Sequence, residues 1–158
     1  MKILGLDPGL AHTGYALIEA DKTKIKAVVY GCIETSPKAR KEERILTIWQ
    51  ELSKIIKKYR PDKMAAEQLF FAKNARSALV VGQALGLIYL CAAEEKIPFY
   101  EYTPLQVKQA LTGYGRADKE QVQKMLKNIL KLKKIPQPSH AADALAVAFC
   151  CFGTKDFK

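Results

Sequence analysis

The first third of the chain alternates short apolar runs with turn residues. Runs rich in apolar and β-branched residues occur at 2–7, 13–20 and 25–35, separated by a Pro-Gly pair and by a charged stretch. Runs of this length, bounded by turn residues, are typical of β-strands. The pattern predicts three consecutive antiparallel strands at the start of the chain.

After residue 40 the apolar positions change to a helical period. Between residues 41 and 60 they recur every three or four positions with Lys and Glu between them, and Pro61 ends the pattern. Such a period predicts an amphipathic helix with one buried face. The same criteria predict a strand at 63–68, a helix at 75–96, a strand at 99–102 and helices at 105–112, 119–133 and 140–152.

This order of elements predicts the fold class. Three antiparallel strands followed by strands that alternate with helices specify an α/β fold, with a mixed five-stranded sheet flanked by helices. With 158 residues, 49% of them hydrophobic, the chain can bury a core without disulfides or metals and does not have the composition of a disordered protein. Because no repeat or second domain is visible in the pattern, we predict a single domain over residues 1–158.

Net charge and cysteine usage indicate the class of partner and the cellular compartment of the protein. Lys and Arg number 26 against 16 Asp and Glu, and the net charge of +10 favours a polyanionic partner, although such charge can also serve solubility alone. The four cysteines form no CxxC pair, which is typical of reduced, buried thiols. The first residues do not form a signal peptide, and the longest apolar stretch, 78–93, is shorter than the ~20 residues of a membrane span. We expect a cytoplasmic protein.

Three carboxylates lie in unusually apolar surroundings. Asp7 ends the run KILGL, Glu67 follows MAA, and Asp143 lies within AADALAVAF. Carboxylates are seldom buried unless they are paired or bind a cation. A simpler interpretation also exists, in which Asp7 forms a turn before Pro-Gly, and His140 and Asp143 are cap or first-turn residues after Ser139.

The predicted topology brings these acids together. Asp7 and Glu67 end strands that would be parallel neighbours, and open α/β sheets place ligands at that edge. His140 and Asp143 are three residues apart, so they share one helix face and can project onto the same edge. Three carboxylates suit Mg²⁺ or Mn²⁺ better than structural zinc. The four residues therefore predict a two-metal site for phosphoryl transfer.

Four sequence blocks, in order, cover nearly the whole chain. They are ILGLDPGLAHTGYALIE at 3–19, AAEQLFFAKNARSALVVGQALG at 65–86, EYTPLQVKQALTGYGRADKEQVQ at 101–123 and HAADALAVA at 140–148. Together they resemble the RuvC family of bacterial Holliday junction resolvases, which belongs to the ribonuclease H-like superfamily. The resemblance implies a ribonuclease H-like sheet. It carries the metal-binding acids of the family onto Asp7, Glu67 and Asp143, and His140 occupies a position that holds aspartate in some relatives.

The resemblance also implies an activity. Family members resolve four-way DNA junctions in homologous recombination and repair by paired symmetric nicks. We therefore expect metal-activated water to hydrolyse a backbone phosphodiester and leave 5′-phosphate and 3′-hydroxyl ends. The expected cofactor is Mg²⁺, with two ions per active site and Mn²⁺ as a substitute. The branch-migration complex RuvA–RuvB is a candidate partner.

The segment after Glu67 is a candidate DNA contact. Two adjacent aromatics stand there beside cations, and an exposed aromatic in such a loop can stack on an unpaired base. In the alternative interpretation one of the two phenylalanines fills the core. By resemblance Phe70 is the wedge at the junction centre. The candidate DNA-binding residues of this segment are Phe70, Lys73, Asn74 and Arg76.

A second basic segment follows at 108–134. Lys124, Lys127 and Lys131 would lie on one side of the predicted helix, where a solvated polar face is the usual explanation. The resemblance places Lys108 and Lys119 near the active site, in contact with the phosphates that flank the cut. Arg116 lies in the glycine-containing turn 113–117 and is a further candidate DNA contact.

The predicted helix 75–96 is apolar nearly all round. It contains Gly82 and Gly86 as a GxxxG spacing, which membrane helices use for association, but Glu94 and the residues after it close a stretch that is too short to span. A helix of this kind must be covered on both sides. The resemblance implies that its second face forms a homodimer, whose two sites would match the symmetry of a four-way junction.

Three other functions stay open at this stage. The segment 4–19 also looks like the first phosphate loop of the actin and sugar-kinase superfamily, but those enzymes close two domains around ATP, and this chain is too short for that. The other two alternatives are a ribonuclease H that acts on RNA–DNA hybrids and a non-catalytic DNA-binding protein.

Overall fold

A five-stranded mixed sheet forms the centre of the protein. The computed structural model describes residues 1–68 and 75–154. The strand order is β3-β2-β1-β4-β5, with β1, β2 and β3 antiparallel and with β4 and β5 parallel to β1. The predicted mixed sheet is therefore confirmed. The strands are β1 Lys2–Asp7, β2 His12–Ala20, β3 Ile25–Glu34, β4 Lys63–Glu67 and β5 Phe99–Tyr102.

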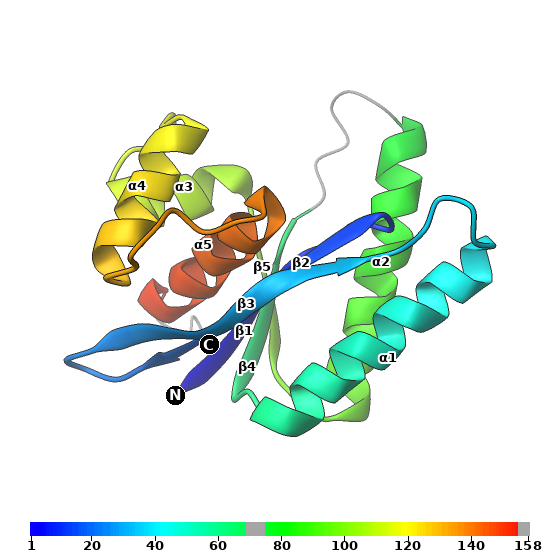
Figure 1. Ribbon diagram of the computed structural model, residues 1–158. Helices are drawn as coiled ribbons and strands as arrows, with labels where there is room; N and C mark the ends of the chain where they lie inside the picture. The colour runs from blue at the N-terminus through cyan, green and yellow to red at the C-terminus, as the bar shows by residue number, and fades with distance from the viewer. Residues whose placement is uncertain (69–74, 155–158) are drawn as a thin grey trace.

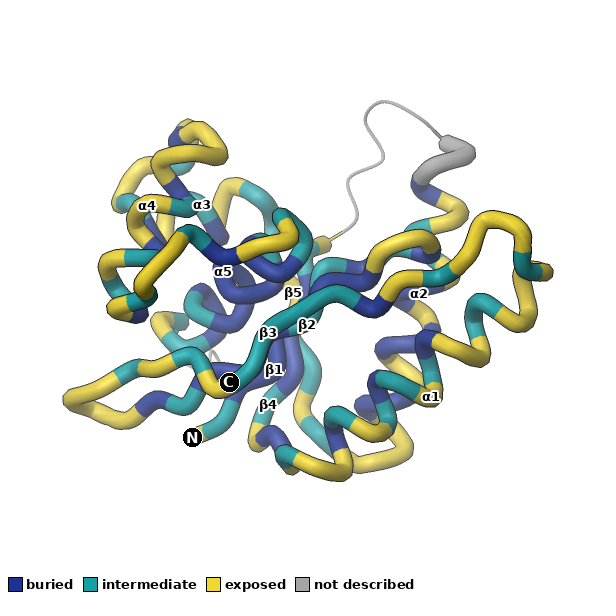
Figure 2. Tube along the Cα trace, in the orientation of Figure 1, coloured by how far each residue is buried: buried dark blue, intermediate teal, exposed yellow. Residues whose placement is uncertain are grey.

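Helices cover both faces of the sheet (Figure 1). On one face lie α1 (Lys41–Tyr59) and α2 (Ala75–Glu94), and on the other lie α3 (Pro104–Thr112), α4 (Lys119–Ile129) and α5 (Ser139–Gly153). Each face has its own apolar core, because residues of β1 and β4 point alternately to the two sides. The buried centre of the sheet and of α5 is visible in Figure 2.

Helix α5 packs unusually close to the sheet. A Cβ atom at Gly5 of β1 would collide with the backbone oxygen of Ala144, and one at Gly14 of β2 would collide with the backbone oxygen of His140. The absence of side chains at these two positions lets the helix backbone approach the strands. This close contact holds the first turn of α5 beside the end of β1.

One detail of the predicted helices is wrong. Helix α4 ends at Ile129 instead of residue 133, because Lys131 adopts a left-handed backbone with φ of 50° and Leu132 donates a backbone hydrogen bond to Lys127 at 2.9 Å. Lys131 is thus not part of the helical stripe. Helix α5 begins at Ser139 with Pro138 as its N-cap residue, so His140 lies in the first turn and is not the cap.

The cysteines agree with the expectation of free thiols. Cys91, Cys150 and Cys151 are buried and Cys32 is half-buried, and all four are free. Within residues 1–68 and 75–154, no helix is long and apolar enough to cross a membrane.

Candidate active site

The period of the strands aims two acids at the α5 face. Ile3 of β1 and Ala65 of β4 pack in the core under α5. Because side chains alternate along a strand, Asp7 and Glu67 at the ends of these strands point to the same side. The two strands are parallel neighbours, with Leu6 opposite Ala66. Both acids therefore lie at the carboxyl edge of the sheet, as their spacing predicts.

The first turn of α5 completes the cluster. His140 and Asp143 project from it, and one ligand atom each of Asp7, His140 and Asp143 lie within 4.8 Å of one another. All three residues are half-buried. Two carboxylates and an imidazole so close together form a site where a divalent cation can be held.

Asp7 and His140 are joined directly. Nδ1 of His140 lies 2.7 Å from Oδ2 of Asp7. Burial raises the pKa of Asp7 above its ordinary value, the hydrogen bond to His140 acts in the opposite direction, and the charge of Asp143 adds to the rise. As a carboxylate Asp7 can only accept, so Nδ1 then donates, and in the neutral imidazole Nε2 keeps its lone pair.

Asp143 has a different partner. Nζ of Lys119 lies 2.9 Å from Oδ2 of Asp143, and the side chains are 57% and 30% exposed. Lys119 is the first residue of α4, whose cap Asp118 accepts a hydrogen bond from the backbone of Gln121. A bound cation is therefore not the sole source of positive charge for these acids, since Lys119 of the same chain already neutralises Asp143. No sequence spacing indicates this pair, because its members are 24 residues apart.

Glu67 lies beside this cluster and faces it from β4. It lines a cavity of about 280 Å³ with Lys108, Lys119 and Asp143, and a second one of about 270 Å³ with Asp7. Burial, together with the charges of Asp7 and Asp143, raises the pKa of Glu67 to about 7, although Lys108 and Lys119 oppose the rise. A carboxyl group with such a pKa is only partly ionised at neutral pH, and a further positive charge nearby favours its ionised form.

A further aromatic contact supports the cluster from β2. The rings of His12 and His140 stack with their centroids 5.3 Å apart and an angle of 8° between their planes. The strand predicted at 13–20 begins after His12, so the sequence pattern does not single out this residue. A strand extended to residue 12 would place His12 on the same side as Gly14, which touches α5.

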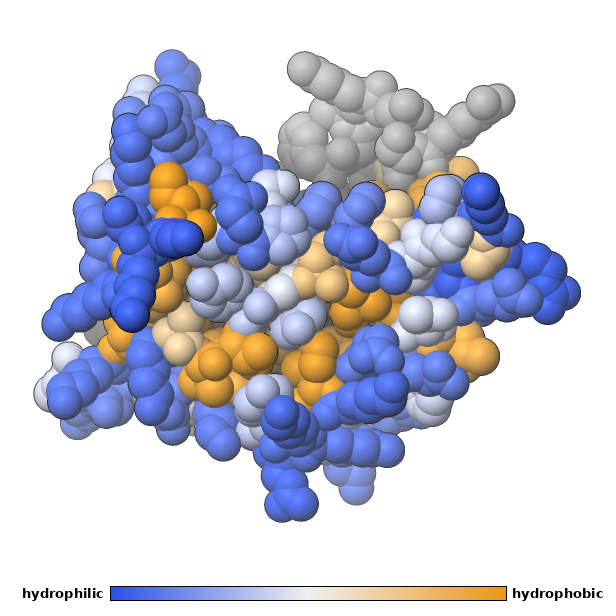
Figure 3. All heavy atoms as spheres, viewed as in Figure 1, coloured by the Kyte–Doolittle hydropathy of each residue, from blue (hydrophilic) through white to orange (hydrophobic). Residues whose placement is uncertain are grey.

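The candidate DNA contacts fall into two groups. Lys108 and Lys119 line the cavity next to Glu67, and Arg116 is exposed in the turn between α3 and α4. Figure 3 shows hydrophilic residues over α4 at this edge of the molecule. Phe70, Lys73 and Asn74 lie outside the described residues, as does the side chain of Arg76.

Helix α2 leaves part of its apolar surface uncovered. Leu79 and Leu90 are 69% and 51% exposed, and Val80 and Tyr89 are also exposed. A Cβ atom added at Gly86 would meet nothing within 4 Å. The helix is thus apolar on both sides, and within residues 1–68 and 75–154 only one of these sides is buried.

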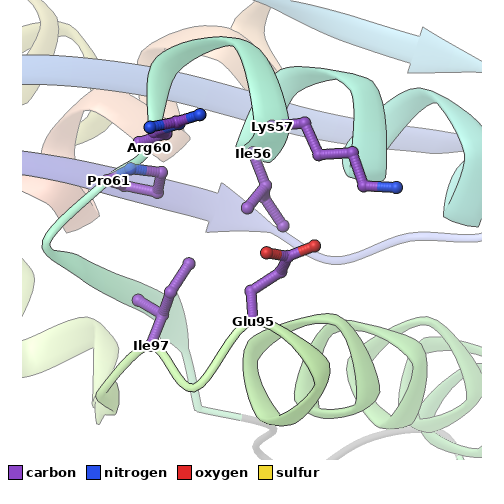
Figure 4. Close-up of a pocket in the computed structure, with 6 residues that line it drawn as sticks. All are labelled: Ile56, Lys57, Arg60, Pro61, Glu95 and Ile97. Carbon is purple, nitrogen blue, oxygen red and sulfur yellow. The ribbon is translucent and has the colours of Figure 1, made fainter.

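A cavity of about 570 Å³ lies far from the acids. It is found where α1 and α2 end, at the opposite edge of the sheet from the carboxyl ends of β1 and β4 (Figures 1 and 4). Its lining combines two basic residues with one acid and apolar side chains, and it contains none of the candidate site residues. The lining residues are Ile56, Lys57, Arg60, Pro61, Glu95 and Ile97.

The chain matches a known protein family over most of its length. The family model described as "Crossover junction endodeoxyribonuclease RuvC" matches residues 3–151. This chain belongs to the RuvC family. The RuvC protein of Finegoldia magna is 51% identical over 156 residues, which cover 98% of this chain and 95% of the relative. The RuvC protein of Caldicellulosiruptor saccharolyticus is 52% identical over 151 residues, which cover 95% of this chain and 91% of the relative.

Solved structures of RuvC proteins agree with this assignment. Thermus thermophilus RuvC superposes with a TM-score of 0.89 at 38% identity, over 97% of this chain and 94% of that chain. The same protein in complex with a Holliday junction substrate gives a TM-score of 0.89 at 36% identity, over 97% of this chain and 94% of that chain. The resemblance to the family and the expected ribonuclease H-like fold are both confirmed.

Proposed function

We propose that this RuvC family member is a metal-dependent endonuclease of one domain, residues 1–158, which resolves four-way DNA junctions by paired symmetric nicks. The observation that carries the proposal is the convergence of Asp7, His140 and Asp143 within 4.8 Å, with Glu67 facing them from the neighbouring strand. The names of the relatives and the likeness to a RuvC–junction complex supply the substrate class.

The donor set fits Mg²⁺, with Mn²⁺ as a substitute. Asp7, Glu67 and Asp143 offer hard oxygen ligands, and His140 offers one nitrogen. Glu67 would complete a second ion position, because it faces both Asp7 and Asp143 across the cavities that it lines. When two such ions are bound, they supply an activated water and stabilise the leaving oxygen of the phosphodiester.

His140 and two lysines near the acids have further roles in the proposed reaction. Asp7 accepts a hydrogen bond from Nδ1–H of the neutral His140 imidazole, which leaves Nε2 free to hold a ligand or to take a proton from water. Lys119 pairs with Asp143 in this structure, and with a cation held at Asp143 its ammonium group would be free to contact a phosphate oxygen. Lys108 lies on the same cavity and can contact the neighbouring phosphate.

The remaining DNA contacts rest on the family resemblance for Phe70, on the residue types of the segment after Glu67, and on the exposure of Arg116. Phe70 would separate bases at the junction centre, while Lys73, Asn74 and Arg76 bind the backbone beside it. Arg116 is exposed at the same edge as Lys108 and Lys119 and extends the positive surface. Together these contacts would hold a strand with its phosphate over the acidic cluster.

We also propose a homodimer through the 75–96 helix. The exposed side chains of Leu79 and Leu90 support this proposal, because an apolar helix face of this kind is costly to leave in water. A twofold dimer presents two sites to a nearly twofold junction. The branch-migration complex RuvA–RuvB is the proposed supplier of the substrate.

The test compares four substrates with Mg²⁺ present. A synthetic four-way junction, a matched duplex, an RNA–DNA hybrid and ATP are incubated with the protein in parallel. We expect nicks in two opposed strands of the junction only, and a DNA ligase should seal the products because they carry 5′-phosphate and 3′-hydroxyl ends. Cleavage of the hybrid without cleavage of the junction, or hydrolysis of ATP alone, would contradict the proposal.

A further inference from the structure

His12 is held firmly beside the active site although it is exposed. It is the first residue of β2, directly after the turn that follows Asp7. Thr13 is fully buried and its Oγ1 donates to the backbone oxygen of Gly9 at 2.6 Å. On the other side Thr35 donates its backbone N–H to Ala11 at 3.0 Å. These bonds fix the backbone on both sides of His12, so the Cα position from which its side chain extends is well defined.

The ring of His140 needs more than one contact to be held in place. Its hydrogen bond to Asp7 fixes only Nδ1, and the second side-chain torsion of a histidine is broad and weakly restricted. The side chain of His140 is also 40% exposed, so surrounding atoms enclose only part of it. The parallel stack with His12 restricts the plane of the ring, which the hydrogen bond leaves free.

We propose that His12 is a positioning residue for His140. Its ring holds the imidazole plane of His140 so that Nδ1 stays on Asp7 while Nε2 stays available to the cation or the attacking water. The stacking contact, and not the nitrogen atoms of His12, does this work, since parallel aromatic rings at this distance attract each other. The inference rests on the proposed function, because it assumes that the cluster binds a divalent cation.

The geometry separates His12 from the ligand set. His12 stacks on the face of His140, and it does not belong to the group of Asp7, His140 and Asp143 that could hold an ion among the described residues. A ligand role for His12 and a positioning role therefore predict different results for a phenylalanine. Phenylalanine keeps a ring for stacking but offers no ligand atom.

The experiment compares His12→Ala, His12→Phe and the wild type, with Ala11→Ser as a control in the same turn. Mn²⁺ binding is measured by calorimetry without DNA. The state of His140 is measured by ¹⁵N NMR of its imidazole in the metal-free protein. The chain has 2 histidines, so the His12 variants show the signals of His140 alone.

We expect His12→Ala to bind Mn²⁺ about three- to tenfold more weakly, the size that loss of one aromatic pair implies. Its His140 signals should indicate a mixture of tautomers instead of one form protonated at Nδ1. His12→Phe and Ala11→Ser should behave like the wild type in both measurements.

Two outcomes would overturn the inference alone. Either His12→Ala binds Mn²⁺ and shows His140 signals like the wild type, or His12→Phe is as weak as His12→Ala, which would make His12 a ligand. A wild-type protein that binds no Mn²⁺, with Asp7→Asn equally inert, would instead overturn the proposed function and the inference with it.

Discussion

Helices α5 and α2, on opposite faces of the sheet, differ in how completely they bury apolar side chains. Nine residues of α5 are buried, and its backbone touches β1 and β2 at Gly5 and Gly14. Helix α2, in the other layer, leaves Leu79 and Leu90 exposed. Figure 2 shows the contrast along the two helices.

This difference suits α5 to holding site residues and α2 to contacting a second copy in the proposed dimer. Helix α5 is enclosed, so it can hold His140 and Asp143 against the strand ends with little freedom, as a catalytic cluster requires. Helix α2 leaves an apolar face exposed, which a second copy would cover in the proposed dimer. In that dimer the chemistry would depend on contacts within each chain, whereas the symmetry would depend on the exposed face of α2.

The largest effect is expected at the cluster itself. Asp7→Asn removes a metal ligand and the acceptor of the His140 hydrogen bond, so junction cleavage should fall by about three orders of magnitude or more. Junction binding, measured by gel shift, should persist or improve because one negative charge near the phosphates is lost. The α2 surface is untouched, so the oligomeric state should not change. Loss of junction binding would mean that Asp7 has a structural role.

The close packing of α5 against β2 can be tested by adding one methyl group at Gly14. Gly14→Ala places a Cβ against the backbone oxygen of His140, and such overpacking should cost about 1–3 kcal/mol in the free energy of unfolding by urea. Gly153→Ala is the control, since a Cβ there meets nothing within 4 Å. Equal stability of the two variants would show that α5 is not packed as tightly as the geometry indicates.

The exposed apolar face of α2 is tested by placing a charge on it. Leu90→Lys should weaken self-association about tenfold or more, because a buried ammonium group has no partner in an apolar interface. Leu46→Lys on α1 is a matched control, since both leucines are 51% exposed. Sedimentation measures the association of each variant. If Leu46→Lys dissociates the protein and Leu90→Lys does not, the dimer uses a different face.

The smallest effect concerns the pH dependence of stability. The pKa of Glu67 in the folded protein, about 7, lies above its ordinary value of 4.5, so ionisation of Glu67 is less favourable in the folded state. Its contribution to stability is present at low pH and is lost as the pH rises through about 7. In EDTA, the wild type should therefore lose a few degrees of melting temperature relative to Glu67→Gln between pH 5 and 8.

Magnesium supplies the control for this last prediction. A bound cation stabilises ionised carboxylates, so an excess of Mg²⁺ should remove the loss in the wild type and leave Glu67→Gln less affected. If the two proteins keep a constant difference at every pH, Glu67 does not ionise in this range.

Much of the fold followed from local pattern. The strands and α1 were predicted from apolar period and turn residues, and the strand order placed Asp7 and Glu67 at one edge. The end of α4 was not predicted, because its apolar residues Ile129 and Leu130 continue the helical period, whereas the backbone turns at Lys131. Periodicity indicates which side chains are buried, but it does not indicate where a backbone hydrogen bond changes partner.

The sequence by itself indicated the candidate ligands Asp7, Glu67, His140 and Asp143 and the edge of the sheet where they lie, with Glu67 beside the other three. Strand period and strand order are local properties that survive into the fold. Only the tertiary structure showed that Lys119 pairs with Asp143 and that His12 stacks on His140. These partners are 24 and 128 residues apart (143 − 119 and 140 − 12), and packing of separate elements brings them within a few ångströms.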